Sequence, residues 1–93
     1  MKPTYPRRML DRLILEELRR APAHGYAISS ALARRGLRVA RSSIHSALRR
    51  LERDGVVAGK WQDGRRRRVY RLTRAGDEAL RLRRLELRSA GRR

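Results

Sequence analysis

The sequence of 93 residues contains no cysteine and no phenylalanine, and aromatic residues make up only 4% of it. The absence of cysteine excludes disulfide bonds, thiolate metal ligands and a cysteine nucleophile. The chain also lacks an apolar run of about 18 residues, which excludes a membrane-spanning helix, and its charged N-terminus lacks the apolar stretch of a secretory signal. We therefore expect one small cytoplasmic domain with no cofactor and no membrane partner.

Acidic residues are also scarce, because 9 Asp and Glu stand against 26 Lys and Arg, for a formal net charge of +17. Such an excess of one sign favours a polyanionic partner, above all nucleic acid. An enzyme is not expected, since the chain has no nucleophile paired with a base, no usable carboxylate pair and no phosphate-binding glycine loop. No metal site is expected at His24 or His45, because few acidic residues stand near either. Local hydrogen bonding at a helix start is the expected role of His24.

The spacing of apolar residues predicts two helices in the first third of the chain. Residues 1–8 contain two prolines and are expected to form an extended arm. The first helix spans residues 9–20, has a wide apolar face, and ends at residues 21–23, which include a proline. The second helix spans about residues 24–35 and ends at Gly36, since glycine is favoured directly after a helix.

A third helix is predicted to begin at Ser42 or Ser43, because either residue is a good N-cap. It ends at the Asp54–Gly55 pair. Its inward stripe repeats at helical spacing and consists of Ile44, Ala47, Leu48 and Leu51.

The opposite face of this third helix is basic and rich in hydrogen-bonding groups, with no large apolar side chain. This is the chemistry that the major groove of DNA requires. The candidate DNA-binding residues are Arg41, Ser42, Ser43, His45, Ser46, Arg49, Arg50 and Arg53. We expect Arg50 and Arg53 to lie nearer the phosphates than the bases, since the N-terminal half of a recognition helix usually meets the base edges. The alternative is a polar face that is merely solvated.

The period of the pattern then changes to that of a β-hairpin, with strands over residues 56–62 and 67–72 joined at the Asp63–Gly64 turn. Four consecutive arginines follow this turn, namely Arg65, Arg66, Arg67 and Arg68. We expect them to contact the minor groove or the flanking phosphates. Alternatively, their charge protects the edge of the hairpin from aggregation.

Trp61 and Tyr70 lie in the two short strands, and two roles are open to them. They could stack on bases, as in proteins that bind single strands, but packing within the core or the hairpin is favoured, because the chain has so few aromatic residues. Thr73 is expected to cap a last helix over residues 73–90.

The order of these elements predicts a winged helix-turn-helix, a mainly α fold with a small β-hairpin. Residues 1–93 would form one domain, in which residues 9–72 are the winged helix and residues 73–90 a dimerisation helix. The last helix is apolar on two sides, so we expect a partner subunit to cover one of them and a homodimer to form. The candidate dimerisation residues are Met9, Leu15, Leu80 and Leu87.

Three segments in this order resemble the PadR family of bacterial transcriptional regulators. They are His24–Gly25–Tyr26, residues 43–57 and residues 67–76. The resemblance implies a winged-helix DNA-binding domain, a dimer built through the C-terminal helix and repression of a promoter near the regulator's own gene. It also implies relief by a small molecule in many members, although we see no apolar and aromatic lining for an effector pocket in this chain.

Together, these observations predict a sequence-specific regulator of double-stranded DNA that acts as a dimeric repressor. Two recognition helices would enter successive major grooves of a palindromic operator and exclude RNA polymerase. The alternative is an architectural DNA- or RNA-binding protein that relies on charge alone.

Overall fold

The computed structural model describes residues 5–64 and 66–91, with side chains as far as residue 82. Its elements are α1 (Arg7–Arg20), β1 (Ala23–His24), α2 (Gly25–Arg34), α3 (Arg41–Arg53), β2 (Val57–Gln62), β3 (Arg67–Leu72) and α4 (Arg74–Gly91). Three parts of the sequence-based expectations lie outside this description: residues 1–4 of the arm, Arg65, and the side chain of Leu87. None of the described helices combines the length and the apolarity needed to cross a bilayer.

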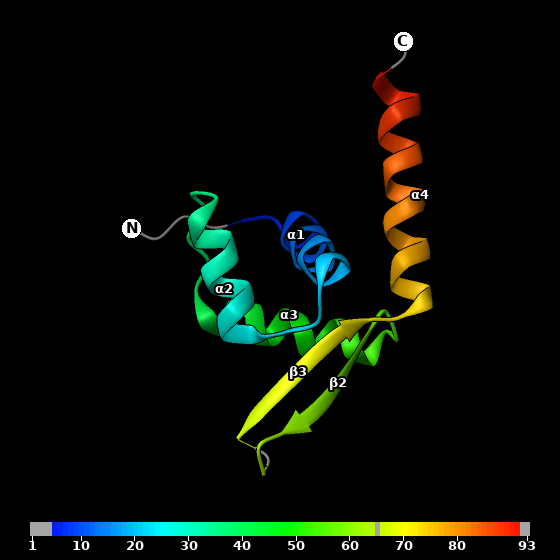
Figure 1. The fold of residues 1–93 in the computed structure, drawn as a ribbon. Helices are drawn as coiled ribbons and strands as arrows, with labels where there is room; N and C mark the ends of the chain where they lie inside the picture. The colour runs from blue at the N-terminus through cyan, green and yellow to red at the C-terminus, as the bar shows by residue number, and fades with distance from the viewer. Residues whose placement is uncertain (1–4, 65, 92–93) are drawn as a thin grey trace.

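Helices α1, α2 and α3 pack against one another, the β2–β3 hairpin projects below them, and α4 leads away from the side of the domain (Figure 1). Their contact surfaces form one apolar core. The inward stripe expected for α3 is buried in this core, which confirms the amphipathic assignment. Burial of these side chains is the main favourable term in holding the three helices together.

The sheet has three antiparallel strands in the order β1–β3–β2. The predicted hairpin is confirmed, with Val57 opposite Leu72 and Gln62 opposite Arg67. Strand β1 is an addition, since its two residues are too few to produce a periodic pattern. It joins the start of α2 to β3 and so ties the helical part of the domain to the hairpin.

The helix α1 begins at Arg7 and not at residue 9, so residues 7–8 belong to the helix and not to the expected arm. The carbonyl oxygen of Pro6 accepts from the N–H of Leu10 at 3.0 Å, because proline can stand directly before a first helical turn.

The observed boundaries agree with the predicted ones in α2 and differ in α3. His24 caps α2 by accepting a hydrogen bond from the backbone N–H of Ala27 at 3.2 Å, which confirms its local role. The helix α3 begins earlier than expected, with Ala40 as its N-cap and no side-chain capping bond. The carbonyl oxygen of Ala40 already accepts from the N–H of Ser43 at 3.0 Å, so Ser42 and Ser43 lie inside the first turn.

The start of α4 is fixed to the turn that follows α3. The hydroxyl of Thr73 donates to the carbonyl oxygen of Gly55 at 2.7 Å and accepts from the N–H of Gly76 at 3.1 Å, as a helix cap does. The backbone of Thr73 also donates to the carbonyl oxygen of Val56 at 3.1 Å. A Cβ atom at Gly76 would overlap this same carbonyl, so only glycine permits the close approach.

The expectation that Leu15 and Leu80 lie in a dimer interface is wrong. Their side chains are only 2% and 1% exposed, and both belong to the core of the single chain. The physical reason is that α1 packs against α4 and β3 as well as against α2 and α3, so its wide apolar face is covered within the chain. Met9, in contrast, is 41% exposed.

Candidate nucleic-acid interface

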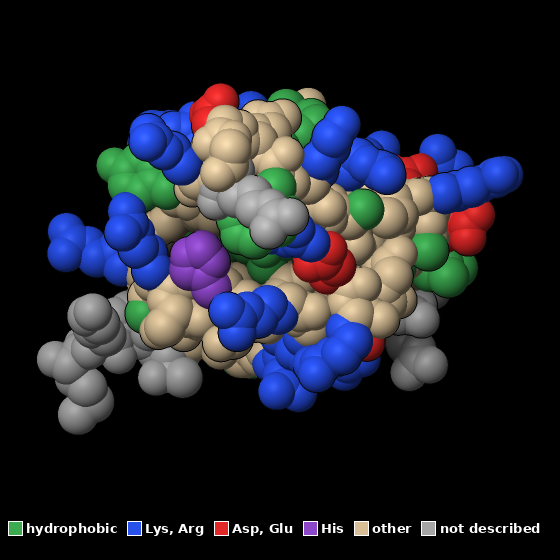
Figure 2. Space-filling view, turned by 90° about the horizontal axis from the view of Figure 1, so that it is seen from below, with side chains coloured by type: hydrophobic (Ala, Val, Ile, Leu, Met, Phe, Trp, Pro, Cys, Tyr) green, Lys and Arg blue, Asp and Glu red, His purple; other side chains and the backbone are tan. Residues whose placement is uncertain are grey.

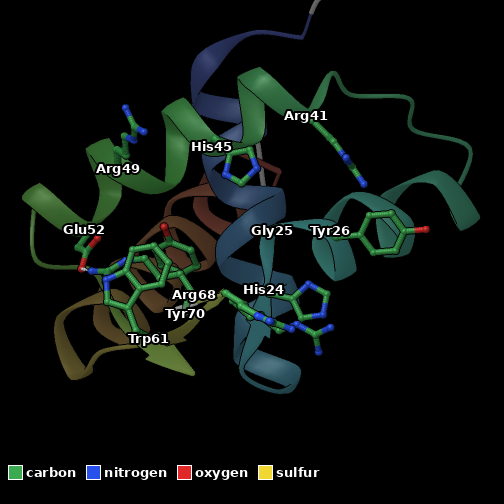
Figure 3. Close-up of a pocket in the computed structure, with 12 residues that line it drawn as sticks. His24, Gly25, Tyr26, Arg41, His45, Arg49, Glu52, Trp61, Arg68 and Tyr70 are labelled. Atoms are coloured by element: carbon green, nitrogen blue, oxygen red, sulfur yellow. Dashed lines mark hydrogen bonds and ion pairs between the residues drawn. The ribbon is translucent and has the colours of Figure 1, made fainter. Parts of the chain in front are cut away.

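A cleft of about 670 Å³ opens between α3, the start of α2 and the β2–β3 hairpin, here called the wing (Figure 3). Its lining is rich in cationic and aromatic groups. The lining residues are His24, Gly25, Tyr26, Arg41, His45, Arg49, Glu52, Trp61, Arg66, Arg67, Arg68 and Tyr70. Lys and Arg side chains border the face of the molecule that is seen from below in Figure 2. Of the α3 candidates, Arg41, His45 and Arg49 thus share one concave surface with the wing, and the others lie outside it.

The polar face predicted for α3 is exposed to solvent. The exposed residues are Arg41, Ser42, Ser43, His45, Ser46, Arg49 and Arg53. The imidazole of His45 lies against the first residue of α2, where a Cβ atom on Gly25 would approach its Cε1 to 3.0 Å. A glycine at this position therefore lets α2 begin directly beside α3.

Arg50 is the exception on α3, because it turns towards α1 and forms an ion pair there. Its Nη1 and Nη2 atoms donate to the two carboxylate oxygens of Asp11 at 2.6 and 2.9 Å. This hydrogen bonding raises the pKa of Arg50 above its ordinary value, while partial burial opposes the shift. The structure thus separates Arg50 from the exposed arginines on either side of it and joins it to the core helix.

The four wing arginines differ in exposure and in ion pairing. Arg66 and Arg67 are exposed and form no ion pair with another described residue. Arg68 instead pairs with Glu52 of α3. Arg65 lies outside the described residues. Of the basic wing expected from the sequence, Arg66 and Arg67 are the described members that present unpaired charge to a partner.

The two aromatic residues of the hairpin differ in their burial. Tyr70 is only 6% exposed and belongs to the core, as expected. Trp61 is 51% exposed and does not belong to the core, so of the two packing environments expected for it only the hairpin remains. Its ring contacts the guanidinium of Arg68, whose Cζ lies 5.2 Å from the ring centroid. Trp61 lies at the cleft because it occupies the outer part of β2, beyond the reach of the core.

Tyr26 is a site residue that the reasoning from sequence missed. It is 59% exposed in the first turn of α2, and the guanidinium of Arg41 lies 4.8 Å above its ring. The ring also stacks on that of His24, with the centroids 6.3 Å apart. A helical projection of the sequence would have predicted this exposure, because Tyr26 lies about 200° around the helix from the buried Ile28.

The groups that line the cleft are suited to binding an anionic partner. Among the described residues, no group of three or more His, Asp or Glu side chains is placed to hold a metal ion. Exposed guanidinium groups, an imidazole, hydroxyls and two half-exposed aromatic rings can bind phosphates and base edges. Glu52 is the acidic residue of the lining, and its carboxylate is occupied by Arg68.

Residues 14–82 match the transcriptional regulator PadR-like family. A transcriptional regulator from Mycobacterium tuberculosis is 44% identical over 59 residues, which cover 61% of this chain. The chain spans about half the length of that relative, since the match covers 55% of it.

Solved structures show the same relationship. A PadR family regulator from Eggerthella lenta has a TM-score of 0.81 at 34% identity, over 90% of this chain and 77% of the other. Bacillus subtilis PadR in complex with operator DNA has a TM-score of 0.72 at 27% identity, over 82% of this chain and 46% of the other. The family match covers most of the chain, and the fold is that of the solved members. The chain therefore belongs to the PadR-like family of transcriptional regulators.

Proposed function

We propose that this protein binds double-stranded DNA in a sequence-specific manner and represses transcription as a homodimer on a palindromic operator. The observation that carries the proposal is the cleft in which Arg41, His45 and Arg49, from the exposed polar face of α3, lie opposite the basic wing. The similarity to Bacillus subtilis PadR, whose structure was solved in complex with operator DNA, supports the same assignment. An enzymatic activity has no support in the cleft, whose groups are suited to binding.

The exposed face of α3 would enter the major groove. Arg49 lies in the middle of this face and has no ion pair with another described residue, so it is free to donate to a guanine. His45 and Ser46, one turn earlier, would meet neighbouring base edges. Arg53, in the last turn, would approach a phosphate.

The wing and the start of α2 would hold the DNA backbone on either side of the groove. Arg66 and Arg67 would contact phosphates or the minor groove, and Arg65, which lies outside the described residues, is proposed to do the same from its place in the sequence. Tyr26 would donate its hydroxyl to a phosphate, because Arg41 covers one face of its ring and leaves the rim exposed. These contacts fix the register of α3 without reading sequence.

Two copies of the chain would occupy half-sites about one helical turn apart. The exposed apolar side chains of Met9 and Leu82 are the described groups that a second subunit could cover. Leu87 remains a predicted dimerisation residue, because the sequence of the last helix is apolar on two sides and a partner subunit would cover one of them. Sedimentation at micromolar concentration in moderate salt tests the dimer, and a monomer there would contradict it.

The DNA-binding proposal is tested by selecting duplexes from a random library with the purified full chain. The affinities for the selected and a shuffled duplex are then compared across a salt series. We expect the selected duplex to be palindromic and to bind about 10³-fold more tightly. If the two duplexes bind alike with a steep salt dependence, the protein is an architectural binder that acts through its charge, and the regulator proposal fails.

Two alanine variants of exposed arginines supply the residue-level control for this assay. Arg49→Ala is expected to lower the preference for the selected duplex, because a base contact is lost. Arg20→Ala removes the same charge from the end of α1, outside the cleft, and is expected to leave the preference unchanged. Equal losses in both variants would show that net charge, and not the α3 face, determines binding.

A further inference from the structure

Glu52 is the acidic residue among the cationic and aromatic groups of the cleft (Figure 3), and it makes two contacts with the wing. Its Oε2 atom accepts from the backbone N–H of Gly59 at 3.2 Å and from Nη2 of Arg68. Gly59 belongs to β2 and Arg68 to β3, so one side chain from the last turn of α3 holds both strands.

The guanidinium of Arg68 lies in a slot between the strands and the helix. Its Cζ lies 5.2 Å from the centroid of the Trp61 ring and 5.7 Å from that of Tyr70. The floor of the slot is Gly59, where a Cβ atom would come within 2.6 Å of the Arg68 Nε. Any larger residue at this position would therefore push the guanidinium away from Glu52.

Neither charge of this pair is well placed for contact with a phosphate. The side chain of Arg68 is 26% exposed and that of Glu52 is 31% exposed, whereas Arg66 and Arg67 are exposed residues. The hydrogen bond to Glu52 also raises the pKa of Arg68, and the ion pair offsets the charge of Arg68 with that of Glu52. An unpaired carboxylate facing a polyanion would lower the affinity through repulsion, and Arg68 offsets this charge on Glu52.

We propose that Glu52 and Arg68, seated on Gly59, are positioning residues that fix the angle of the wing relative to the recognition helix. Apart from this pair, the hairpin is held to the helices by the backbone turn at residues 54–56, by core packing at the base of the strands and by the pairing of β1 with β3 as far as Val69. The pair sits further along the hairpin, where Trp61 lies opposite Arg68. It therefore resists rotation of the outer part of the wing.

The inference rests on the proposed function for its second consequence, which concerns DNA. If α3 and the wing are held at a fixed angle, both can engage one duplex without a further loss of conformational entropy. The pair would then increase the affinity for the selected duplex, which needs both elements in register. Binding to random duplexes depends mainly on charge and would be affected little.

Two variants separate positioning from charge. Gly59→Ala displaces the Arg68 side chain and retains both charged groups, and the displaced atoms belong to the far end of a flexible side chain. Glu52→Gln removes the acceptor charge without changing its size. Glu16→Gln is the matched control, because it makes the same change in an α1 ion pair with Arg12, outside the cleft.

The first readout needs no DNA, because the chain contains a single tryptophan, Trp61, which contacts Arg68. In Gly59→Ala and Glu52→Gln we expect faster depolarisation of its emission, stronger quenching by iodide and faster amide exchange in β2 and β3. Glu16→Gln should behave as the wild type. If both wing variants retain the wild-type emission and exchange, the pair does not hold the wing and the inference is overturned.

The second readout is the affinity for the selected duplex relative to a random duplex. We expect the ratio to fall about fivefold or more in Gly59→Ala and Glu52→Gln, and the double variant Glu52→Gln/Arg68→Ala to lose no more than Arg68→Ala alone. If Arg68→Ala instead weakens both duplexes equally and lowers the salt dependence, Arg68 is a phosphate contact and the inference is overturned. If the wild type prefers no duplex while the tryptophan signal changes as expected, the proposed function fails and the coupling of wing to helix stands.

Discussion

Two adjacent arginines lie at the centre of α3, and replacing each with alanine is expected to change a different property of the protein. Arg49 is exposed, whereas Arg50 forms a two-point ion pair with Asp11. Arg50→Ala should therefore destabilise the fold, because it leaves a carboxylate without its partner in a residue that is only 8% exposed. Arg49→Ala should leave stability unchanged and act only on DNA.

The size of the loss in Arg50→Ala follows from its two charge-assisted hydrogen bonds. Hydrogen bonds to charged groups contribute about 1.5–3 kcal/mol, and removing one partner of a fully buried ion pair costs about 3–5 kcal/mol. Water can reach this pair in part, since the side chains of Arg50 and Asp11 are 20% and 11% exposed. We therefore expect a loss of about 2–3 kcal/mol in the free energy of unfolding, or a fall of about 10 °C or more in Tm.

The assay is thermal and urea unfolding of the wild type, Arg50→Ala, Asp11→Ala and the double variant, with Arg49→Ala as the neighbouring control. We expect the double variant to lose less than the sum of the two single variants, because the partners act as a unit. At a temperature where it is folded, Arg50→Ala should retain most of its preference for the selected duplex. Unchanged stability together with a large loss of DNA binding would refute this reasoning and make Arg50 a DNA contact.

The remaining predictions concern single groups. Gly76→Ala should lower the unfolding free energy by about 2 kcal/mol or more in urea, since its Cβ would overlap the Val56 carbonyl, although alanine normally favours a helix by about 1 kcal/mol. Ala75→Gly, at the exposed neighbouring position, should cost only about 1 kcal/mol, and a stabilised Gly76→Ala would contradict the geometry. Thr73→Val removes the cap of α4 and should cost about 1–2 kcal/mol in the same measurement. Tyr26→Phe should leave Tm unchanged and weaken the selected duplex about tenfold in fluorescence anisotropy, whereas an unchanged affinity would exclude a phosphate contact by the hydroxyl.

The sequence predicts the elements that depend on local pattern. The α3 stripe, the hairpin with its Asp63–Gly64 turn and the cap at Thr73 each follow from the spacing or chemistry of near neighbours. Both turn residues adopt a positive φ, 53° and 61°, which is the conformation that this dipeptide favours.

The features that the sequence did not predict depend on contacts between distant residues. Helix and strand periodicity places Arg49 and Arg50, and likewise Arg67 and Arg68, in different directions, but it does not show which of them has a partner in the folded chain. Their roles differ through Asp11 and Glu52, which lie 39 and 16 residues away in the chain. Leu15 was misassigned for the same reason, since only the folded chain shows that α4 and β3 cover α1.

Because α4 is held at its base, a small change in its angle there produces a larger displacement at its far end. Its 18 residues correspond to a rod about 27 Å long, at about 1.5 Å per residue. Its base is held by Thr73 and Gly76 to the turn at Gly55 and Val56, directly after α3. A tilt of about 5° at this base moves the distal end by about 2 Å. If α4 moves as a rigid rod, a displacement of that size at its far end corresponds to a small rotation beside the turn where α3 ends.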